Sequence, residues 1–365
     1  MRALEARQPR WSVAQCLILF SVLTSLLIAA RPCAVSVGRA FPIAPAHGRQ
    51  ARPLFPAISD HLVVWLEYGA TPHWTHPWSY ANIYGRDLAT GRQFAVTTRG
   101  TAVSAPSLSG HLVVWADCRH CSGGKGIPGY GNTRIYGKDL ATGREFLISP
   151  DQGGPIVSGH RVVWVAIGSG GEQINGQDLA TGRMFHVSGP RQALYDTLAL
   201  SGSLVVWAEF RGGRYAIYGK DLSTGRMSVI AAPTRVDLHD PVLDGHIVVW
   251  TRYDVSRRGR QGSDLVGKDL ATGRTFQVTH IPPAHDYASY DLAKAVGDHM
   301  VVWTEAPAGS PTTFQHVQLH GKDLSTGATF VVTPGTSTGD APAISANRVV
   351  WANSSGLWGA VLTRR

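Results

Sequence analysis

Residues 105–117 and 135–149 read APSLSGHLVVWAD and IYGKDLATGREFLIS, and they contain the pattern that decides the fold. The tripeptide Val-Val-Trp occurs seven times, ending at Trp65, Trp115, Trp164, Trp207, Trp250, Trp303 and Trp351. Each of the first six copies is followed by a block similar to IYGKDLATGR. Successive tryptophans are 43 to 53 residues apart, a spacing typical of one four-stranded blade of a β-propeller.

Each repeat predicts four short strands separated by Gly-rich or polar turns. In the second repeat APSLSG is a short strand with a Gly turn, and HLVVWAD, IYGKDL and EFLIS are the other three strands. Because Val-Val-Trp is apolar on both faces of its strand, the strand needs cover on both sides, and stacked blades provide it. We therefore predict an all-β, seven-bladed β-propeller with four-stranded antiparallel blades.

The seventh repeat ends in LWGAVLTRR and lacks a fourth strand. Residues 38–45, GRAFPIAP, align without a gap to residues 143–150, GREFLISP. We expect this N-terminal strand to complete the last blade and close the ring, which removes open sheet edges. The predicted propeller domain spans residues 37–365.

Residues 1–36 predict an export signal. Three arginines in the first ten positions precede an apolar stretch at 16–30, followed by small residues suited to cleavage after Ala30 or Ser36. The apolar stretch is shorter than the roughly 20 residues that span a bilayer, although an uncleaved membrane anchor is the alternative. We expect an extracytoplasmic protein, secreted or in the cell envelope, with no membrane insertion after cleavage.

The formal net charge is +9, but much of it belongs to the repeat itself. Lys or Arg precedes the aspartate of most IYGKDLATGR blocks and another Arg follows its glycine, which indicates a solvated ring of turns. No clustered basic patch with stacking aromatics is visible, so we expect no nucleic-acid partner. The sequence also lacks a serine elbow, a zinc-binding helix motif and a phosphate loop.

The repeat P-x-hydrophobic-S-G, then VVW, then IYGKDLATG resembles the TolB-type β-propeller repeats of bacterial envelope and secreted proteins, across essentially all of the mature chain. The resemblance implies the fold and says little about activity, because propellers have many functions. It includes an aspartate and a glycine at one turn, which we interpret as a carboxylate cap and a residue with positive φ. These are Asp87, Asp139, Asp178, Asp221, Asp269 and Asp323, with Gly91, Gly143, Gly182, Gly225, Gly273 and Gly327.

The connections between strands fall into a uniform set and a variable set. The SGH-like and LATGR-like turns are nearly identical between repeats, and in a propeller they open on one face. The second-to-third-strand loops and the blade-to-blade connectors open on the other face and vary widely. Variation confined to one face of a regular scaffold predicts a binding site there.

An aromatic cluster lies in the variable loop of the first repeat. It consists of Trp74 and Trp78 with His73, His76 and Tyr80. Such rings stack on sugars or on a partner's side chains. The alternative is that they pack on one another to hold a Pro-rich loop.

Cys118 and Cys121 form the motif CRHC in the second repeat. A structural zinc site needs four ligands, and a redox CxxC needs a thioredoxin-like βαβ context. In an exported protein we expect a disulfide that clamps the loop.

Four acidic residues are predicted near the channel mouth. Asp196, Asp291 and Asp340 stand six residues before the turn position of their repeats, and Asp240 stands five before. Converging carboxylates suit a hard cation such as calcium, and the alternative is that they are solvated turn residues. His239 and His285 lie beside these acids and suggest an acid/base pair.

The function that these patterns favour is a non-catalytic, exported, monomeric binding or scaffold module without a cofactor. Its variable-loop face would recognise an envelope protein or a glycan. The alternative is an extracytoplasmic carbohydrate-active enzyme, a glycan hydrolase or lyase, with an acid/base site at the channel mouth.

Overall fold

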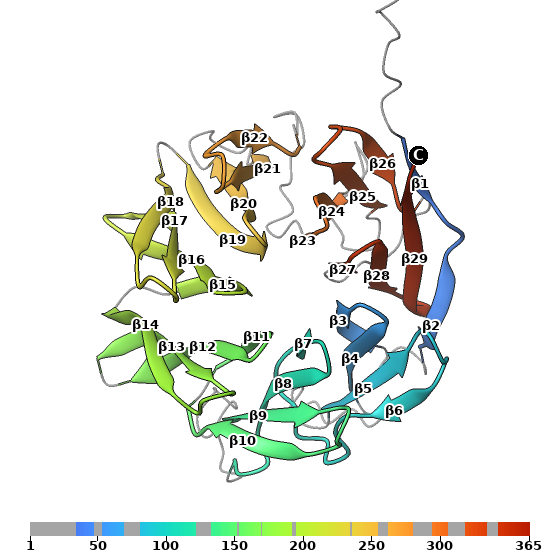
Figure 1. The fold of residues 1–365 in the computed structure, drawn as a ribbon, viewed down its shortest axis with the longest axis horizontal. Coiled ribbons are helices and arrows are strands. Elements are labelled where there is room, and N and C mark those ends of the chain that lie inside the picture. The colour runs from blue at the N-terminus through green and yellow to red at the C-terminus, as the bar shows by residue number, and fades with distance from the viewer. Residues whose placement is uncertain are drawn as a thin grey trace, which may run out of the picture.

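Seven antiparallel sheets stand around a central axis in the computed structural model of the chain (Figure 1). The structure describes residues 34–46, 53–68, 81–121, 133–151, 153–168, 170–191, 195–233, 236–254, 262–279, 294–305, 318–333 and 342–365. All regular elements in these ranges are strands, and none of the described residues forms a helix that could cross a membrane. The predicted all-β, seven-bladed propeller is confirmed.

Six blades consist of four strands that follow one another in sequence, from the central axis outward (Figure 1). Blade one contains β3 (Pro53–Ser59), β4 (Leu62–Tyr68), β5 (Ala81–Asp87) and β6 (Gln93–Ala95). Blade two contains β7 (Ser107–Ser109), β8 (Leu112–Asp117), β9 (Arg134–Asp139) and β10 (Glu145–Ser149). Blade three contains β11 (Ile156–Ser158), β12 (Arg161–Gly168), β13 (Gly171–Asp178) and β14 (Met184–Arg191).

The next three blades repeat this order. Blade four contains β15 (Tyr195–Ser201), β16 (Leu204–Arg211), β17 (Arg214–Asp221) and β18 (Met227–Ala231). Blade five contains β19 (Asp237–Asp244), β20 (Ile247–Asp254), β21 (Gly262–Asp269) and β22 (Thr275–Gln277). Blade six contains β23 (Lys294–Gly297), β24 (Met300–Glu305), β25 (Gln318–Asp323) and β26 (Thr329–Val331).

Blade seven joins the two ends of the folded domain (Figure 1). Its inner strands are β27 (Ala343–Ser345), β28 (Arg348–Asn353) and β29 (Gly356–Arg364). Along β29, β2 (Phe41–Pro45) pairs with the first part, and β1 (Val35–Val37) pairs with the last three residues of that strand. The predicted closure by an N-terminal strand is confirmed.

The ring of Phe41 explains why β2 fits blade seven. In blade one, the glycine of the IYG pattern lies against a ring of the fourth strand, because a Cβ on Gly85 would stand 2.5 Å from Phe94. In the same way, a Cβ on Gly359 would stand 2.8 Å from the ring of Phe41. Phe41 therefore occupies the position of Phe94, which is the physical basis of the gapless alignment.

β1 has no counterpart in the other repeats, so the repeat pattern does not predict it. It begins at Val35, two residues before the predicted start of the domain at residue 37. The Gly38 N–H donates to the Val361 carbonyl at 2.8 Å, which keeps the chain against β29 between β1 and β2.

The Val-Val-Trp tripeptides form the interfaces between blades. In blade one, Val63 and Trp65 pack against Val350 of blade seven, whereas Val64 packs in a cluster with Trp115 of blade two. All seven tryptophans of the tripeptides are at most 4% exposed. Strands that are apolar on both faces are thus covered on both faces, as the sequence predicts.

Basic residues in the third strands tie neighbouring blades together. Arg86 donates to the Ile43 carbonyl at 2.7 Å, and Lys138 donates to the Val96 carbonyl at 2.7 Å. Equivalent bonds to the preceding blade come from Lys220, Lys268 and Lys322. The interpretation of these five residues as a solvated ring is wrong, because their charges are used in the seams between blades.

A second set of hydrogen bonds runs around the inner strands. At six of the seven seams, the side chain of the residue that ends the inner strand accepts the backbone N–H of the first turn residue in the next blade, at 2.9–3.0 Å. The pairs are Ser59 with Gly110, Ser109 with Gly159, Ser158 with Gly202, Ser201 with Gly245, Asp244 with Asp298, and Ser345 with Asp60. The last pair links blade seven to blade one. At the remaining seam the acceptor position is Gly297, which has no side chain.

Candidate functional site

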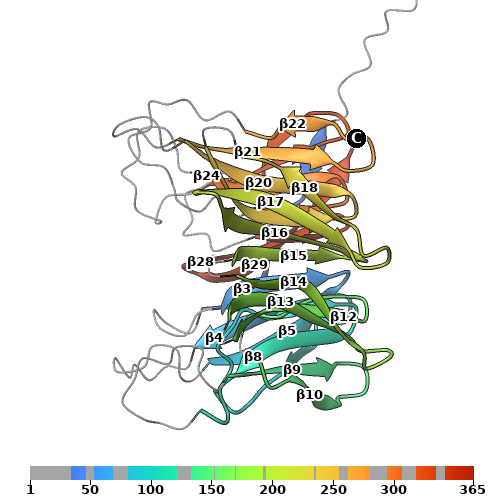
Figure 2. The ribbon, with the colours of Figure 1, turned by 90° about the vertical axis from the view of Figure 1, so that its left-hand side faces the viewer.

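The strand connections differ between the two faces of the ring (Figure 2). On one face, which we call the turn face, the first-to-second turn has two residues in every blade, and the third-to-fourth turn has five in blades one to six. On the opposite face, the loop face, the second-to-third connection ranges from two residues between β12 and β13 to sixteen between β8 and β9. The strand ends that carry the regular turns and those that lead into the irregular connections are therefore at opposite ends of the blades.

The turn-face aspartates are structural. In blade one, Asp87 Oδ1 accepts the N–H groups of Ala89 and Thr90 at 2.8 and 3.3 Å, and Gly91 has a φ of 76°. The other blocks repeat this capped turn, so the predicted turn role is confirmed. Hydrogen bonds to the carboxylates hold the pKa of these aspartates below the usual value.

Most of the predicted loop-face residues lie outside the described residues. These are the aromatic cluster and three of the residues predicted at the channel mouth: His73, Trp74, His76, Trp78, Tyr80, His285, Asp291 and Asp340. The strands that lead into these segments end on the loop face, at Tyr68 of β4 for the aromatic cluster. Their role in binding stays a prediction.

Two predicted acids lie on inner strands. Asp196 belongs to β15, and its side chain is outside the described part of the structure. Asp240 lies at an irregularity of β19 between His239 and Val242, with a φ of 49°. The structure thus places Asp240 at a bulge, where the local strand direction changes.

The structure also describes the surroundings of His239 and the turn from which the position of Asp291 is counted. His239 packs on the ring of Tyr215 with the centroids 4.4 Å apart, so this histidine has an aromatic neighbour from blade four. In blade six the turn position is Asp298, with a φ of 49°, so Asp291 stands seven residues before it and not six. Within the described ranges no three His, Cys, Asp or Glu side chains group as metal ligands. The calcium hypothesis stays untested, because it depends on Asp291 and Asp340.

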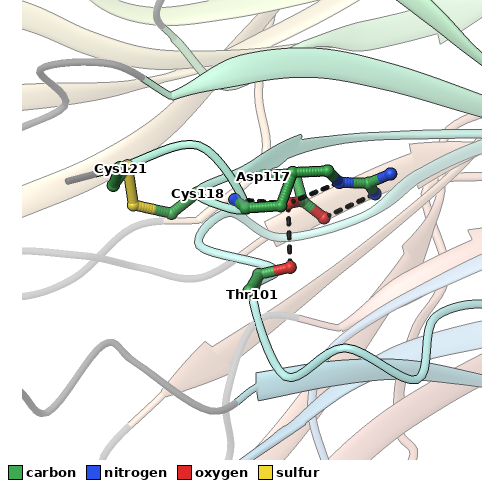
Figure 3. Close-up of a disulfide and its surroundings, with 5 residues drawn as sticks. Thr101, Asp117, Cys118 and Cys121 are labelled. Carbon is green, nitrogen blue, oxygen red and sulfur yellow. Dashed lines mark hydrogen bonds and ion pairs between the residues drawn. A yellow bond between two sulfur atoms is a disulfide. The ribbon is translucent and has the colours of Figure 1, made fainter. Parts of the chain in front are cut away.

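Cys118 and Cys121 are joined by a disulfide directly after β8 (Figure 3). The chain there is also fixed by its backbone, since the Cys118 N–H donates to Thr101 and the Cys121 N–H donates to Cys118. The side chain of Thr101 donates to Asp117 at 2.8 Å (Figure 3). The bridge therefore closes a four-residue loop whose second residue is Arg119.

A recurring contact on the loop-face half of the blades is a carboxylate that caps the indole of Val-Val-Trp. The indole N–H donates to an acid two residues later on the same strand, at 3.0–3.2 Å. The pairs are Trp65 with Glu67, Trp115 with Asp117, Trp207 with Glu209 and Trp303 with Glu305. This contact was not predicted from the repeats, although WLE, WAD, WAE and WTE recur in the sequence at the same position.

In blade two an arginine completes this arrangement. Arg119 binds Asp117 with two guanidinium nitrogens at 2.9 and 3.0 Å and Glu145 at 2.5 Å, and it lies 3.8 Å from the centroid of the Tyr136 ring. Tyr136 in turn stacks on Trp115. The indole of Trp115, the ring of Tyr136 and the guanidinium of Arg119 therefore form one stack. The buried carboxylate of Asp117 binds both ends of that stack.

Blade four repeats the arrangement with a second arginine. Arg211 binds Glu209 at 2.6 and 3.1 Å and lies 4.9 Å from the Tyr218 ring, which stacks on Trp207. Asp117 and Glu209 are each 1% exposed. Burial alone would raise the pKa of Asp117, but hydrogen bonds from Arg119, Trp115 and Thr101 outweigh it, and the pKa is lowered.

Blade one has the same aromatic and acidic groups around a pocket of about 430 Å³. The pocket lies at the seam between blades seven and one, and its lining consists of Ala44, Pro45, Trp65, Glu67, Tyr84, Gly85, Gln93 and Phe94. Pro45 pairs with Gly356, next to the β28–β29 hairpin, so the pocket lies in the loop-face half of the seam. Its size is in the range of small-ligand sites.

Comparisons with known proteins identify the architecture. No family model matches the sequence, and no curated protein matches it. The β-propeller domain of the Trilobed protease from Pyrococcus furiosus superimposes with a TM-score of 0.58 at 13% identity, covering 87% of this chain and 96% of that one. An oligogalacturonate lyase from Vibrio parahaemolyticus gives 0.59 at 10% identity, covering 90% and 96%. These likenesses establish the fold alone.

Two further matches are partial or weak. A prolyl endopeptidase superimposes with a TM-score of 0.57 at 12% identity over 87% of this chain, which spans 50% of that protein. TolB from Acinetobacter baumannii gives a TM-score of only 0.44 at 12% identity, covering 93% and 82% of the chains. The β-propeller architecture is shown, and the finer resemblance to TolB-type propellers stays a prediction.

Proposed function

We propose that this propeller is an exported, non-catalytic binding module that recognises an envelope protein or a glycan through its loop face. One observation carries the proposal: the strand ends that lead into connections of varied length all lie on that face (Figure 2). Residues on the turn face form the capped turns and the hydrogen bonds between blades, so substitutions there lower the stability of the fold. The loop face can vary without disturbing those bonds.

The TolB-type repeat pattern and the N-terminal segment support the location outside the cytoplasm. Both are sequence features, and they agree with a Cys118–Cys121 disulfide, which persists in oxidising compartments. The aromatic loop of blade one is the proposed contact for the ligand, with Trp74 and Trp78 as its anchors.

The test compares the wild type with the Trp74→Ala/Trp78→Ala double variant in a glycan array and in pull-downs from envelope fractions. We expect ligand capture to fall at least tenfold, with an unchanged melting temperature, because these residues have no counterpart in the sequence repeat that forms the core. The matched control is Phe210→Ala, which removes a 40% exposed aromatic from the loop-face hairpin of blade four and should leave capture intact. Equal capture by the double variant and the wild type would contradict the proposal.

The alternative, a carbohydrate-active enzyme, is favoured by the full-length similarity to a lyase that acts on oligogalacturonate. Its test is sugar release from polysaccharides by the wild type. Release that disappears in Asp291→Ala or His285→Ala would replace the binding-module proposal with the enzyme.

A further inference from the structure

The end of β29 is held in place by β1. Residues 362–364 pair with β1 in antiparallel register. The Ser36 hydroxyl donates to the Thr363 carbonyl at 3.3 Å, and the Arg365 N–H donates to the Ala34 carbonyl at 3.0 Å. Four consecutive residues, 34–37, therefore bind residues 362–365.

The side chains of β1 belong to the apolar cluster that blades six and seven share. Val35 and Val37 pack against this cluster, which contains Val332 of blade six and Leu362 of β29. Leu362 is only 1% exposed. Removal of β1 would therefore uncover apolar surface at the seam between these two blades, and burial of such surface stabilises the fold.

Beside β1, the end of β29 makes polar contacts across the same seam. Arg364 donates from Nε to the Asp323 carboxylate and from Nη1 to the Asp298 carboxylate, both at 2.9 Å. Asp323 is fully buried. At this seam Gly297 occupies the acceptor position of the inner strands, so Arg364 bonds the two blades where the side-chain bond of the other six seams cannot form. The pairing of Val35 with Arg364 fixes the backbone that carries the guanidinium.

These contacts distinguish the two cleavage positions that the sequence offers. A cut after Ser36 would follow small residues at the first and third positions before it, Ser36 and Ala34, which is the pattern of a signal-peptide cleavage site. A cut after Ala30 has Ile28 at the third position, so the sequence alone does not favour it. The cut after Ser36 would, however, leave only Val37 of β1, whereas the cut after Ala30 leaves the strand whole.

We propose that export processing cuts after Ala30, so that the mature protein begins at Arg31 and retains β1. The small residues around Ser36 then form a strand that pairs with the end of β29, and they are not a cleavage site. The proposal rests on the export that is part of the proposed function. It concerns processing and no loop-face residue, so its failure leaves the proposed binding function standing.

The first experiment produces the chain with its own N-terminal segment in an export-competent bacterial host. N-terminal sequencing and intact mass then determine where the exported protein begins, and we expect a start at Arg31. A start at Val37, or an exported chain that still begins at Met1, would overturn the proposal. A chain that keeps Met1 and stays in the cytoplasm would contradict the export as well, so the two failures are distinguishable.

A matched pair of substitutions tests which position is cut. Ala30→Gln places a large side chain directly before the proposed cut and should abolish the start at Arg31. Ser36→Gln places the same side chain before the alternative cut and should leave the start at Arg31 unchanged. Loss of processing in Ser36→Gln, with normal processing in Ala30→Gln, would overturn the proposal.

A third experiment tests the physical reason, with chains that start at Arg31, Ala34 and Val37 and are produced without the apolar stretch. Hydrogen exchange of the Arg365 amide should be about tenfold faster or more in the Val37 chain, because its acceptor, the Ala34 carbonyl, is missing. The melting temperature of that chain should also be lower. The Ala34 chain is the matched control and should behave like the Arg31 chain. Equal exchange and equal melting temperatures in all three chains would remove the reason for retaining β1 and overturn the proposal.

Discussion

At the scale of single residues, each aspartate of the turn face caps the backbone N–H groups of its own turn. Asp221 accepts hydrogen bonds from the side chain and the backbone of Ser223, which lower its pKa from the usual 3.8 to about 2. The pKa values of the equivalent aspartates are lowered as well. A carboxylate whose pKa is depressed in the folded state stabilises the fold above its unfolded pKa and loses that effect as the pH falls toward the folded value.

We therefore expect the urea midpoint of unfolding to fall as the pH is lowered from 3.8 to about 2. Asp221→Asn retains an acceptor for the turn but cannot titrate, so the variant should lose less stability over this interval than the wild type. Chemical denaturation at several pH values measures the difference. An equally steep decline in both proteins would show that the turn carboxylate is not a source of the acid sensitivity.

At the scale of strands and loops, the structure explains what the CRHC motif does. The disulfide and the backbone bonds of residues 118–121 hold Arg119 on Tyr136 and against Asp117, which is buried. The spacing of the two cysteines predicts a bridge, but the sequence does not reveal its purpose. That purpose depends on the stacked Trp115 and Tyr136, which come from neighbouring strands and meet only through the register of β8 and β9.

We predict that intact-mass analysis of the exported protein finds no free thiol at Cys118 or Cys121 until reductant is added. Cys118→Ser/Cys121→Ser should lower the free energy of unfolding by about 2 kcal/mol, the loop-entropy value for so short a ring. Arg119→Ala should cost about 3 kcal/mol, because it leaves the buried Asp117 without its main partner. Stoichiometric zinc on the purified protein, or a free thiol at Cys118 or Cys121 before reduction, would contradict the disulfide assignment.

At the scale of the whole molecule, the ring was predictable because the seven copies of the repeat can be aligned with one another within the single sequence. The tryptophan spacing defines the blades, and the match of GRAFPIAP to GREFLISP defines the closure through Phe41. The bonds of Arg86 and Lys138 across the seams were not predictable, because a charged residue beside a turn has the same pattern whether it faces solvent or a neighbouring carbonyl. The variable loops share no repeat, so the comparison that reveals the blades says nothing about their conformation.

The closure gives the last prediction. Deleting residues 34–46 removes β1 and β2, exposes the length of β29 and leaves Gly359 without the Phe41 ring. We expect aggregation, or a loss in melting temperature on the order of 10 °C or more, because an unpaired edge and an uncovered apolar seam arise together. Deleting residues 1–33 is the matched control and should leave the melting curve unchanged, since β1 and β2 remain.

A point substitution separates the packing of the closure from its backbone pairing. Phe41→Ala should cost about 2 kcal/mol, below the usual penalty for a fully buried aromatic because the ring is partly buried, and Phe94→Ala should cost a similar amount, because both rings cover the glycine of an IYG-type strand. Equal losses would show that blade seven is sealed by the same contact as blade one, although its outer strand comes from the other end of the chain. A melting curve unchanged by the deletion of residues 34–46 would show that the pairing of β1 and β2 with β29 does not stabilise the ring.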